Sequence, residues 1–287
     1  YEEIDNLAAG CAGLLSMLGN RLDEAFIERH AGTLRVISNY AVGYNNIDLG
    51  AAKKRGIVVT NTPGVLTEST ADLAWALIMA VARRIVESDS YTRAGNFEGW
   101  APELFLGGDV HGKVLAIVGL GRIGQAVARR AAGFGMQIIY YNRTCKPETE
   151  NELGCRKVEL DALMAEADFI SLHVPLTGET RHLIDERRLG LMKRSAYLIN
   201  TARGPVVDEH ALVRALKAGR IAGAGLDVYE EEPRLHPELQ GLPNTVLAPH
   251  IGSGTTATRK RMAQIAVDNI TAVLRGEKPA HPVPLPS

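Results

Sequence analysis

The chain has 287 residues, of which 46% are hydrophobic and 23% are charged, and its formal net charge is −1. This is the balance of an ordinary globular protein, and the length suits two domains, since a domain averages roughly 150 residues. The near-zero charge argues against a broad electrostatic surface for nucleic acid or for an anionic membrane.

The first third of the chain alternates short apolar runs with helix-like segments. The apolar runs predict short buried strands over residues 11–18, 34–38 and 56–60. A helix is predicted over 48–54, and a long helix with one apolar face over 66–85. Residues 90–110 carry glycine, proline and aromatic residues and are expected to be irregular.

A regular alternation of strands and helices begins near residue 114. Strands are predicted over 114–118, 137–141, 169–174, 197–201, 222–227 and 245–248. The helices between them include 123–134 and 208–217, the second with Asp208 as N-cap and Gly219 as its end, and a last helix covers 254–275. Apolar strands separated by helices predict a parallel sheet covered on both faces. Six such strands are typical of a doubly wound dinucleotide-binding domain.

The strongest local motif is GLGRIG at residues 119–124, which follows a predicted strand and opens a predicted helix. Gly119 would allow the tight turn, Gly121 would let the backbone approach a pyrophosphate, and Gly124 would let the helix pack closely on the sheet. The helix N-terminus would then offer N–H groups and a positive dipole end to the phosphates.

The end of the next strand bears on the choice of cofactor. An acidic residue there, about 20 positions after the glycines, would bind the ribose hydroxyls of NAD. This chain has Asn142, Arg143 and Thr144 instead. Arginine binds a 2′-phosphate that an aspartate would repel. The sequence therefore favours NADPH, with NADH possible.

Polar residues follow three consecutive strands of the predicted sheet. Arg203 lies in NTARG, Asp227 closes AGAGLD, His250 follows TVLAP, and Glu232 lies in the loop YEEEP. Because ligands bind beyond the carboxyl ends of parallel strands, we expect these side chains to meet in one crevice.

These residue types suit the reduction of a carbonyl group. Histidine is the side chain best suited to donate a proton near neutral pH. A carboxylate beside an imidazole orients the ring and favours its protonated form. An arginine can hold a carboxylate substrate and polarise its carbonyl. The residues alone leave open which of the three adjacent glutamates pairs with the histidine.

Four blocks, GLGRIG, INTARGPVVDEHAL, AGAGLDVYEEEP and LAPHIGS, resemble the D-isomer-specific 2-hydroxyacid dehydrogenases. The similarity is greatest to the glyoxylate/hydroxypyruvate reductase branch, which includes 2-ketogluconate reductases. SNYAVGYNNID and NTPGVLTESTADLAWAL extend it over nearly the whole chain. The resemblance implies an α/β protein with a doubly wound dinucleotide-binding domain and a smaller flavodoxin-like substrate domain. It also implies a homodimer.

The resemblance assigns individual roles. Arg203 would bind the substrate, Glu232 would be the acid before the proline, and His250 would donate the proton. Asp227 would bond the nicotinamide amide. The other implied contacts are Val42 and Gly43 to the substrate carboxylate, and Thr70, Leu120, Arg122, Ile123, Thr201, Ala202 and Gly252 to the cofactor. Trp100 would either reach the substrate pocket of a partner subunit or simply pack at the dimer interface.

The resemblance also implies a discontinuous layout. Residues 1–65 and 252–287 would form the substrate domain, and residues 66–251 the dinucleotide-binding domain. Because the chain crosses between them twice, we expect a hinge that closes over the substrate. Relatives carry a strand and helix before the segment that matches Tyr1, so about 30 to 40 further residues are expected there, without which a sheet edge would be exposed.

Cys11, Cys145 and Cys155 form no CxxC pair and no cluster with metal-site spacing. An odd number of cysteines without a pattern is typical of a reducing compartment. The sequence shows no run of about 18 apolar residues for a membrane span and no signal peptide. We therefore expect a cytoplasmic protein with no metal ion and no membrane or nucleic-acid partner.

Several alternatives remain on the same scaffold. The substrate could be glyoxylate, hydroxypyruvate or 2-ketogluconate, and D-lactate dehydrogenases are also possible. Phosphoglycerate dehydrogenases are less favoured, because many carry an added regulatory domain that is absent here. Formate dehydrogenases are less favoured, because they pair the histidine with glutamine, where this chain has Glu232. A corepressor-like nucleotide sensor could keep the same three residues without turnover. A structural nucleotide-binding protein would leave the coincidence of Arg203, Glu232 and His250 unexplained.

Overall fold

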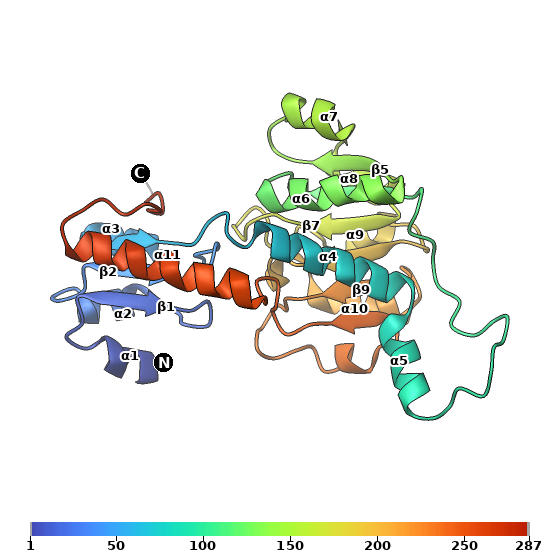
Figure 1. Ribbon diagram of the computed structural model, residues 1–287, viewed down its shortest axis with the longest axis horizontal. Helices are drawn as coiled ribbons and strands as arrows, with labels where there is room; N and C mark the ends of the chain where they lie inside the picture. Colours follow the sequence, from blue (N-terminus) through green and yellow to red (C-terminus); the bar gives the residue numbers. More distant parts are fainter. Residues whose placement is uncertain (1, 286–287) are drawn as a thin grey trace. The chain divides into compact units, whose positions relative to one another are not determined.

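The computed structural model describes residues 2–285, which form two compact units (Figure 1). Of the described residues, the first unit comprises 2–66 and 253–285, and the second comprises Thr67–Gly252. No helix in the described part of the chain is long and apolar enough to cross a membrane.

The first unit contains a three-stranded parallel sheet in the order β1-β2-β3. Its strands are β1 (Gly13–Ser16), β2 (Val36–Asn39) and β3 (Val58–Thr60), and its helices are α1 (Glu2–Ala8), α2 (Glu24–His30), α3 (Leu49–Lys54) and α11 (Thr256–Leu274). Asp23 and Asp48 cap α2 and α3, each by accepting a hydrogen bond from a backbone N–H in the first turn. Helix α11 packs along β1 and β2, so the C-terminal part of the chain completes this unit (Figure 1). The three predicted strands each lie within two residues of these bounds.

The second unit is built on a seven-stranded parallel sheet in the order β10-β9-β8-β7-β4-β5-β6. The strands are β4 (Val114–Val118), β5 (Gln137–Tyr141), β6 (Arg156–Lys157), β7 (Phe169–Leu172), β8 (Tyr197–Asn200), β9 (Gly223–Leu226) and β10 (Thr245–Leu247). The six predicted strands are confirmed, and the chain order reverses between β4 and β7. The sequence did not predict β6, because this edge strand has only two residues and both are charged.

Helices cover both faces of this sheet (Figure 1). On one side α4 (Thr67–Ala82) and α6 (Arg122–Ala131) pack on Leu115 and Ile117 of β4. On the other side α8 (Leu160–Glu166), α9 (Glu186–Leu191) and α10 (Glu209–Lys217) pack on Ala116 and Val118. Successive strand residues face opposite layers, which is why the central strands are apolar throughout. The remaining elements are α7 (Pro147–Leu153) and the 3₁₀ turns η1 (Ala132–Phe134), η2 (Gly204–Val206) and η3 (Leu239–Gly241).

The helix predicted over 66–85 is shorter than expected. It ends at Ala82, and a second helix, α5 (Ile85–Arg93), begins after Arg84, whose φ of 53° is left-handed. The Arg84 guanidinium donates to Glu87 at 2.8 Å and lies 5.0 Å from the centroid of the Phe105 ring. These contacts stabilise a break between the two helices that no glycine or proline marks in the sequence. The irregular segment accordingly begins near residue 94 and not near 90.

Candidate active site

Three neighbouring strands end at the same edge of the large sheet. Strands β8, β9 and β10 pair in parallel, so their carboxyl ends lie side by side. Arg203 lies three residues after β8, Asp227 directly follows β9, and His250 lies three residues after β10. The topology therefore brings together the polar residues that the sequence placed at strand ends.

His250 and Glu232 form a hydrogen-bonded pair. The distance from His250 Nδ1 to Glu232 Oε2 is 2.8 Å, and the Tyr229 N–H donates to Glu232 Oε1 at 3.0 Å. An ionised carboxylate can only accept, so Nδ1 carries the proton of this bond. Among residues 2–285 no hydrogen-bond partner is recorded for Nε2 of His250. That nitrogen is left to exchange a proton with a ligand.

The electrostatics of Glu232 favour its ionised form. Burial alone would raise the pKa of this carboxyl, but the hydrogen bond and charge of His250, the Tyr229 N–H and the charge of Arg203 together hold the pKa below its ordinary value of 4.5. The same carboxylate is thus shared between the histidine and the arginine of the predicted set. Both basic groups keep it charged at neutral pH.

Arg203 is half-buried beside this pair. Burial lowers the pKa of its guanidinium, and the nearby charge of Glu232 opposes that shift. Its Nη1 donates to the Ala202 carbonyl oxygen at 2.6 Å. The next residue must be glycine, because a Cβ at Gly204 would lie 1.8 Å from the Tyr229 carbonyl oxygen. This close backbone crossing joins the arginine turn to the loop that carries Glu232.

Asp227 holds the backbone that follows His250. Its side chain is 1% exposed, and its two carboxylate oxygens accept the N–H groups of Ile251 at 2.6 Å and Gly252 at 2.8 Å. Burial raises the pKa of this carboxyl despite those two bonds. Thr70 Oγ1 donates to the Gly252 carbonyl oxygen at 3.2 Å from helix α4. His250 itself has a left-handed φ of 54°, a strained conformation for a residue with a side chain, and these bonds hold it in place.

The glycine loop between β4 and α6 fits a dinucleotide. Gly119 has a φ of 100°, and a Cβ there would lie 2.8 Å from the His173 carbonyl oxygen. A Cβ at Gly124 would lie 2.2 Å from the Gly119 oxygen, so the helix packs closely on the turn. At Gly121 a Cβ would meet nothing within 4 Å, which leaves space for a ligand above the helix N-terminus. Thr201 Oγ1, at the end of β8, is buried with no hydrogen-bond partner in the described residues. These observations fit a bound nucleotide cofactor.

The loop after β5 has the composition expected of a phosphate site. Asn142 Nδ2 donates to the carbonyl oxygen of Thr144 at 3.0 Å, which shapes the turn. The Arg143 side chain is 82% exposed, and within residues 2–285 its charge partner is Glu179 at 3.5 Å. Both partners of that ion pair are solvated, so the pair is weak and the guanidinium can turn to a ligand.

The predicted carboxylate-binding amides lie in the first unit. Val42 and Gly43 follow β2, and side-chain amides fix the turn: Asn39 Nδ2 donates to the Gly43 oxygen and Asn61 Nδ2 to the Val42 oxygen, both at 2.8 Å. Across residues 2–285 no acceptor is recorded for the N–H of Val42 or Gly43. A turn whose carbonyl oxygens are hydrogen-bonded and whose N–H groups are available suits an anion. Binding of the substrate carboxylate by Val42 and Gly43 stays a prediction.

Several residues around the site were not predicted from the sequence. Tyr229 contributes its N–H to Glu232, and its hydroxyl donates to the Ala248 oxygen at 2.9 Å, which ties the glutamate loop to the histidine strand. His173 Nε2 lies 2.8 Å from Ser171 Oγ beside Gly119, and burial lowers the pKa of this histidine to about 3. Their positions depend on tertiary packing, and no spacing in the sequence marks them.

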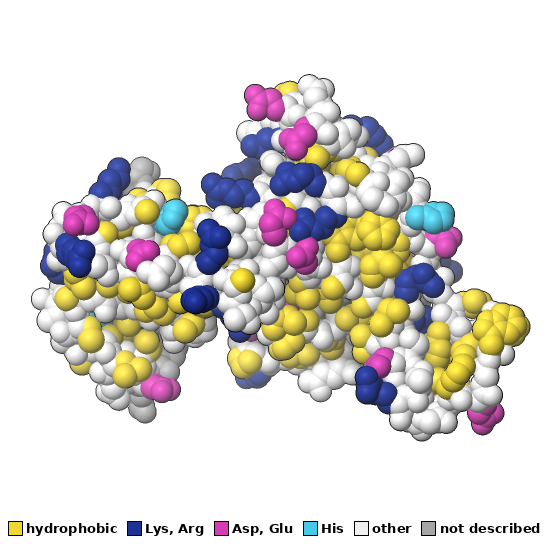
Figure 2. Space-filling model, in the orientation of Figure 1, with side chains coloured by type: hydrophobic (Ala, Val, Ile, Leu, Met, Phe, Trp, Pro, Cys, Tyr) yellow, Lys and Arg dark blue, Asp and Glu magenta, His cyan; other side chains and the backbone are white. Residues whose placement is uncertain are grey.

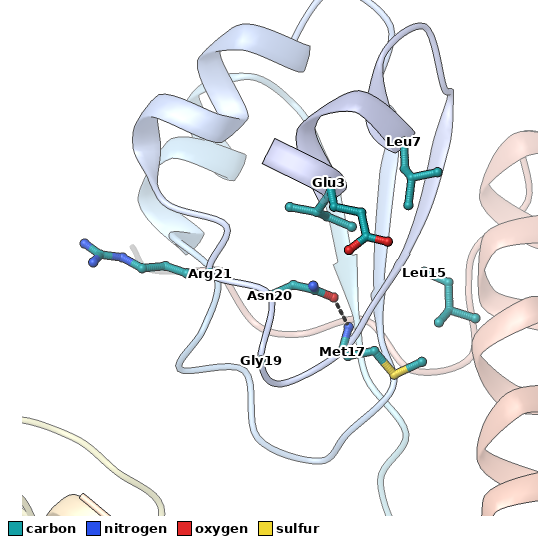
Figure 3. Close-up of a pocket in the computed structure, with 8 residues that line it drawn as sticks. Glu3, Leu7, Leu15, Met17, Gly19, Asn20 and Arg21 are labelled. Carbon is teal, nitrogen blue, oxygen red and sulfur yellow. Dashed lines mark hydrogen bonds between the residues drawn. The ribbon is translucent and has the colours of Figure 1, made fainter. Parts of the chain in front are cut away.

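A separate pocket lies between α1 and β1 in the first unit (Figure 3). Leu7 and Leu15 flank it, and Asn20 Oδ1 accepts the Met17 N–H at 2.7 Å. It contains none of the residues predicted for catalysis or cofactor binding. We assign no function to it.

Comparison with known proteins identifies similar chains over nearly the full length. A family model described as D-isomer specific 2-hydroxyacid dehydrogenase, NAD binding domain, matches residues 75–252. The glyoxylate reductase of Thermococcus litoralis is 57% identical over 270 residues, which are 93% of this chain and 81% of the relative. Identity at this level over this length exceeds what a shared fold alone would give.

Solved structures agree with this similarity. A glyoxylate reductase from Paecilomyes thermophila is 37% identical with a TM-score of 0.89, covering 99% of this chain and 88% of that chain. An NADPH-dependent glyoxylate/hydroxypyruvate reductase from Sinorhizobium meliloti, in complex with NADP and malonate, is 36% identical with a TM-score of 0.88, covering 95% and 83%. Both resemble this chain across both of its units.

Proposed function

The chain belongs to the D-isomer specific 2-hydroxyacid dehydrogenase family, and on this premise we propose that it reduces glyoxylate to the 2-hydroxy acid with NADPH. The observation that carries the proposal is the Glu232–His250 pair, which leaves Nε2 of the histidine available beside a half-buried Arg203. The relatives named above, two of them called glyoxylate reductases and one glyoxylate/hydroxypyruvate reductase, support the substrate.

The residues of this chain account for the proton and for the substrate's orientation. When bound, the nicotinamide supplies a hydride to a carbonyl carbon. Arg203 binds the substrate's carboxylate and polarises its ketone or aldehyde oxygen. The Nε2 proton of the protonated His250 then moves to that oxygen and gives the hydroxyl group, while Glu232 stabilises the imidazolium before the transfer. Solvent returns the proton to Nε2.

The cofactor would be held by the second unit, which we propose is the dinucleotide-binding domain. The loop 119–124 would bind the pyrophosphate, and Thr201, Ala202, Asp227 and Thr70 would line the nicotinamide side. The first unit is then the substrate domain, where Val42 and Gly43 would hold the substrate carboxylate with their N–H groups. Hydroxypyruvate is a second candidate substrate, supported by the Sinorhizobium relative.

The test is a direct assay of turnover. Oxidation of NADPH and of NADH is followed by absorbance with glyoxylate, hydroxypyruvate and 2-ketogluconate in parallel. We expect glyoxylate to be reduced with the highest kcat/KM and NADPH to be preferred. If neither cofactor is oxidised with any of the three while both still bind, the reductase assignment fails. A nucleotide-sensing binding protein would then be the better description.

Arg143 should set the preference for NADPH. Replacing Arg143 with Ala removes the proposed partner of the 2′-phosphate, and a hydrogen bond between charged groups is worth about 1.5–3 kcal/mol. The Kd for NADPH should rise by roughly 10- to 100-fold, and that for NADH should change less than about twofold. Titration of the protein with each nucleotide measures both constants.

Arg156→Ala is the matched control for this experiment. Arg156 lies in the edge strand β6 and is also mostly exposed, at 58%, but its partner is Glu166. Its loss should leave both dissociation constants unchanged. An Arg143 variant that weakens NADH as much as NADPH would refute the phosphate contact.

The second unit exposes a set of apolar side chains that we assign to a homodimer interface. They are Ile85, Val86, Phe97, Trp100 and Leu106, on α5 and on the loop 94–109. Figure 2 shows hydrophobic side chains gathered over this part of the unit at the lower right. Trp100 is 85% exposed and Leu106 is 65% exposed. Apolar surface of this kind is costly in water and marks interaction sites.

Trp100 should be important for dimerisation. Large aromatic side chains dominate interface energies, so Trp100→Ala should raise the dimer dissociation constant by roughly tenfold or more. Sedimentation at a series of concentrations measures this, with Glu98→Gln in the same loop as control. Unchanged association would remove Trp100 from the interface. A higher KM for glyoxylate in the variant at concentrations where it is still dimeric would point to the partner's substrate pocket.

The cysteines support a reducing location. All three are free thiols, and Cys155 is buried, which raises the pKa of its thiol and lowers its reactivity. A chain with an exposed free Cys145 and no disulfide is typical of a reducing compartment. We therefore propose a cytoplasmic enzyme.

A further inference from the structure

Behind the Glu232–His250 pair lies a second group of charged residues that the proposed reaction does not use. We infer that Glu209 and Glu230 form a carboxylate clasp that positions Glu232 against His250, which makes Glu209 a positioning residue for the reaction. His182, which pairs with Glu230, is the third member of this clasp. The inference rests on the proposed function.

Glu209 joins the two ends of the loop that carries Glu232. Its Oε2 accepts the Glu230 N–H at 2.9 Å, and its Oε1 accepts the His236 N–H at 2.9 Å. The backbone N–H groups of residues 230 and 236 are therefore held by one carboxylate. Between them the Arg234 N–H donates to the Glu231 oxygen at 2.9 Å. Glu232 lies inside this closed loop, and its position depends on the closure.

Glu230 accepts a hydrogen bond from Glu209 in turn, and it also contacts the segment that contains Arg181 and His182. Its Oε2 accepts the Glu209 N–H at 3.2 Å, so each glutamate accepts the backbone N–H of the other. Its Oε1 lies 2.6 Å from His182 Nε2 and 3.2 Å from Arg181 Nη2. The Arg181 guanidinium, and His182 when it is protonated, offset the repulsion between the two carboxylates.

The clasp also reaches the turn that carries Arg203. The His182 N–H donates to the Pro205 oxygen at 2.8 Å, two residues after Arg203. Gly204 meanwhile passes against the Tyr229 backbone so closely that no side chain would fit. The loops that carry Arg203 and Glu232 are thus fixed to each other at two points.

A structural role in helix α10 does not explain Glu209. Asp208 already caps that helix by accepting the Ala211 N–H at 2.9 Å. Glu209 is only 8% exposed and turns its carboxylate to the loop instead of to solvent. A buried carboxylate is costly unless it is well bonded, so its two backbone bonds are the reason it can stay buried. By contrast, Glu231 in the same loop is 71% exposed and pairs with Arg234 on the surface.

The test compares Glu209→Gln with the matched variant Glu231→Gln. Glutamine keeps the size of the side chain but has one acceptor oxygen, so its NH₂ group must face one of the two N–H donors. We expect kcat for glyoxylate to fall about tenfold in Glu209→Gln, the scale of one hydrogen bond to a charged group. The affinity for NADPH should not change. Glu231→Gln should match the wild-type protein in both.

A pH profile separates positioning from a general loss of stability. Reduction needs His250 protonated, and a neighbouring carboxylate favours that form. If Glu232 is displaced, the alkaline decline of kcat should move to lower pH in Glu209→Gln. The ¹H NMR resonance of the hydrogen-bonded Nδ1 proton of His250, expected downfield, should weaken or shift in the same variant. The charged and titratable groups around Glu209 and Glu230 are Arg181, His182, His210 and His236, and Glu231→Gln leaves all of them in place.

The outcomes are distinct. An inactive wild-type protein would refute the proposed function itself. An active wild-type protein, with Glu209→Gln unchanged in kcat, pH profile and proton resonance, would refute the clasp. If Glu209→Gln does not fold, Glu230→Gln is measured in its place, because Glu230 accepts the Glu209 N–H in the same reciprocal pair and its side chain is 17% exposed. It must then show the same displacement of the pH profile, or the inference is wrong.

Discussion

Replacing His250 with Gln should lower kcat for glyoxylate reduction about a thousandfold, the usual contribution of a positioned general acid. Glutamine is close to histidine in size and can still bond Glu232, but its amide cannot release a proton near neutral pH. The Kd for NADPH should stay within about twofold, since His250 holds no part of the pyrophosphate loop. Stopped-flow oxidation of bound NADPH measures the chemical step, and nucleotide titration measures affinity.

His111→Gln is the control for this variant, because His111 is exposed in the same unit and no contact of its ring is recorded in the described residues. It should have wild-type kinetics. A His250→Gln protein that kept more than a tenth of the activity would mean that another group donates the proton.

The acid side of the pH profile checks the same pair. Glu232 is ionised above its pKa, which lies below 4.5, and the charged pair with His250 is lost only as the pH falls through that lowered value. The wild-type rate should therefore show no decline around pH 4.5 itself. A decline centred at or above the ordinary glutamate value that also remains in an Asp227→Asn variant, which lacks the carboxyl whose pKa burial raises, would mean that Glu232 is not held by His250 and Arg203 in solution.

The parts of the site that depend on backbone pattern could be predicted from the sequence. GLGRIG follows an apolar strand and precedes a helix, and its glycines occupy positions where a Cβ would collide or where space is required. Strand ends could be counted along the chain, and parallel pairing of β8, β9 and β10 then placed Arg203, Asp227 and His250 at one edge. The spacing of apolar residues and the order of strands along the chain can both be read directly from a sequence.

The choice among the three adjacent glutamates could not be made in this way. A step of one residue changes the direction of a side chain in a loop, and only tertiary contacts decide which one meets His250. The structure pairs Glu232 with His250, Glu230 with His182 and Glu231 with Arg234. Resemblance to the family selected Glu232 for catalysis, and these contacts agree with that selection.

Glu209 illustrates a second limit. An acidic residue in the first turn of a helix is expected to be a solvated group that complements the helix dipole. Its burial and its bonds to Glu230 and His236 arise from a loop 21 to 27 residues further along the chain. The same limit applies to the end of helix α4, where Arg84 adopts a left-handed conformation that its contacts with Glu87 and Phe105 stabilise.

Arg203→Lys should lower kcat/KM for glyoxylate by roughly 100- to 1000-fold, although it keeps the positive charge. Arginine presents a planar fork that matches a carboxylate and a carbonyl oxygen together, whereas lysine offers a single point charge on a flexible chain. Misplacement of the substrate by about 1 Å costs about 100-fold in rate. The loss should appear in kcat as well as in KM, because the ketone oxygen gains charge only as the reaction proceeds. Steady-state kinetics with NADPH in excess measure both.

Two comparisons make this prediction specific. Arg130→Lys alters an arginine that binds Glu68 and Asp72 on the surface of the same unit, and it should leave kcat/KM unchanged. Arg203→Ala should be partly rescued by added guanidinium, which restores the fork without the chain, while ammonium should not rescue it. Equal rescue by both ions would mean that only charge is needed at this position. In that case the fork geometry beside Glu232 would have no part in binding the oxo acid, and the tight crossing at Gly204 would serve folding alone.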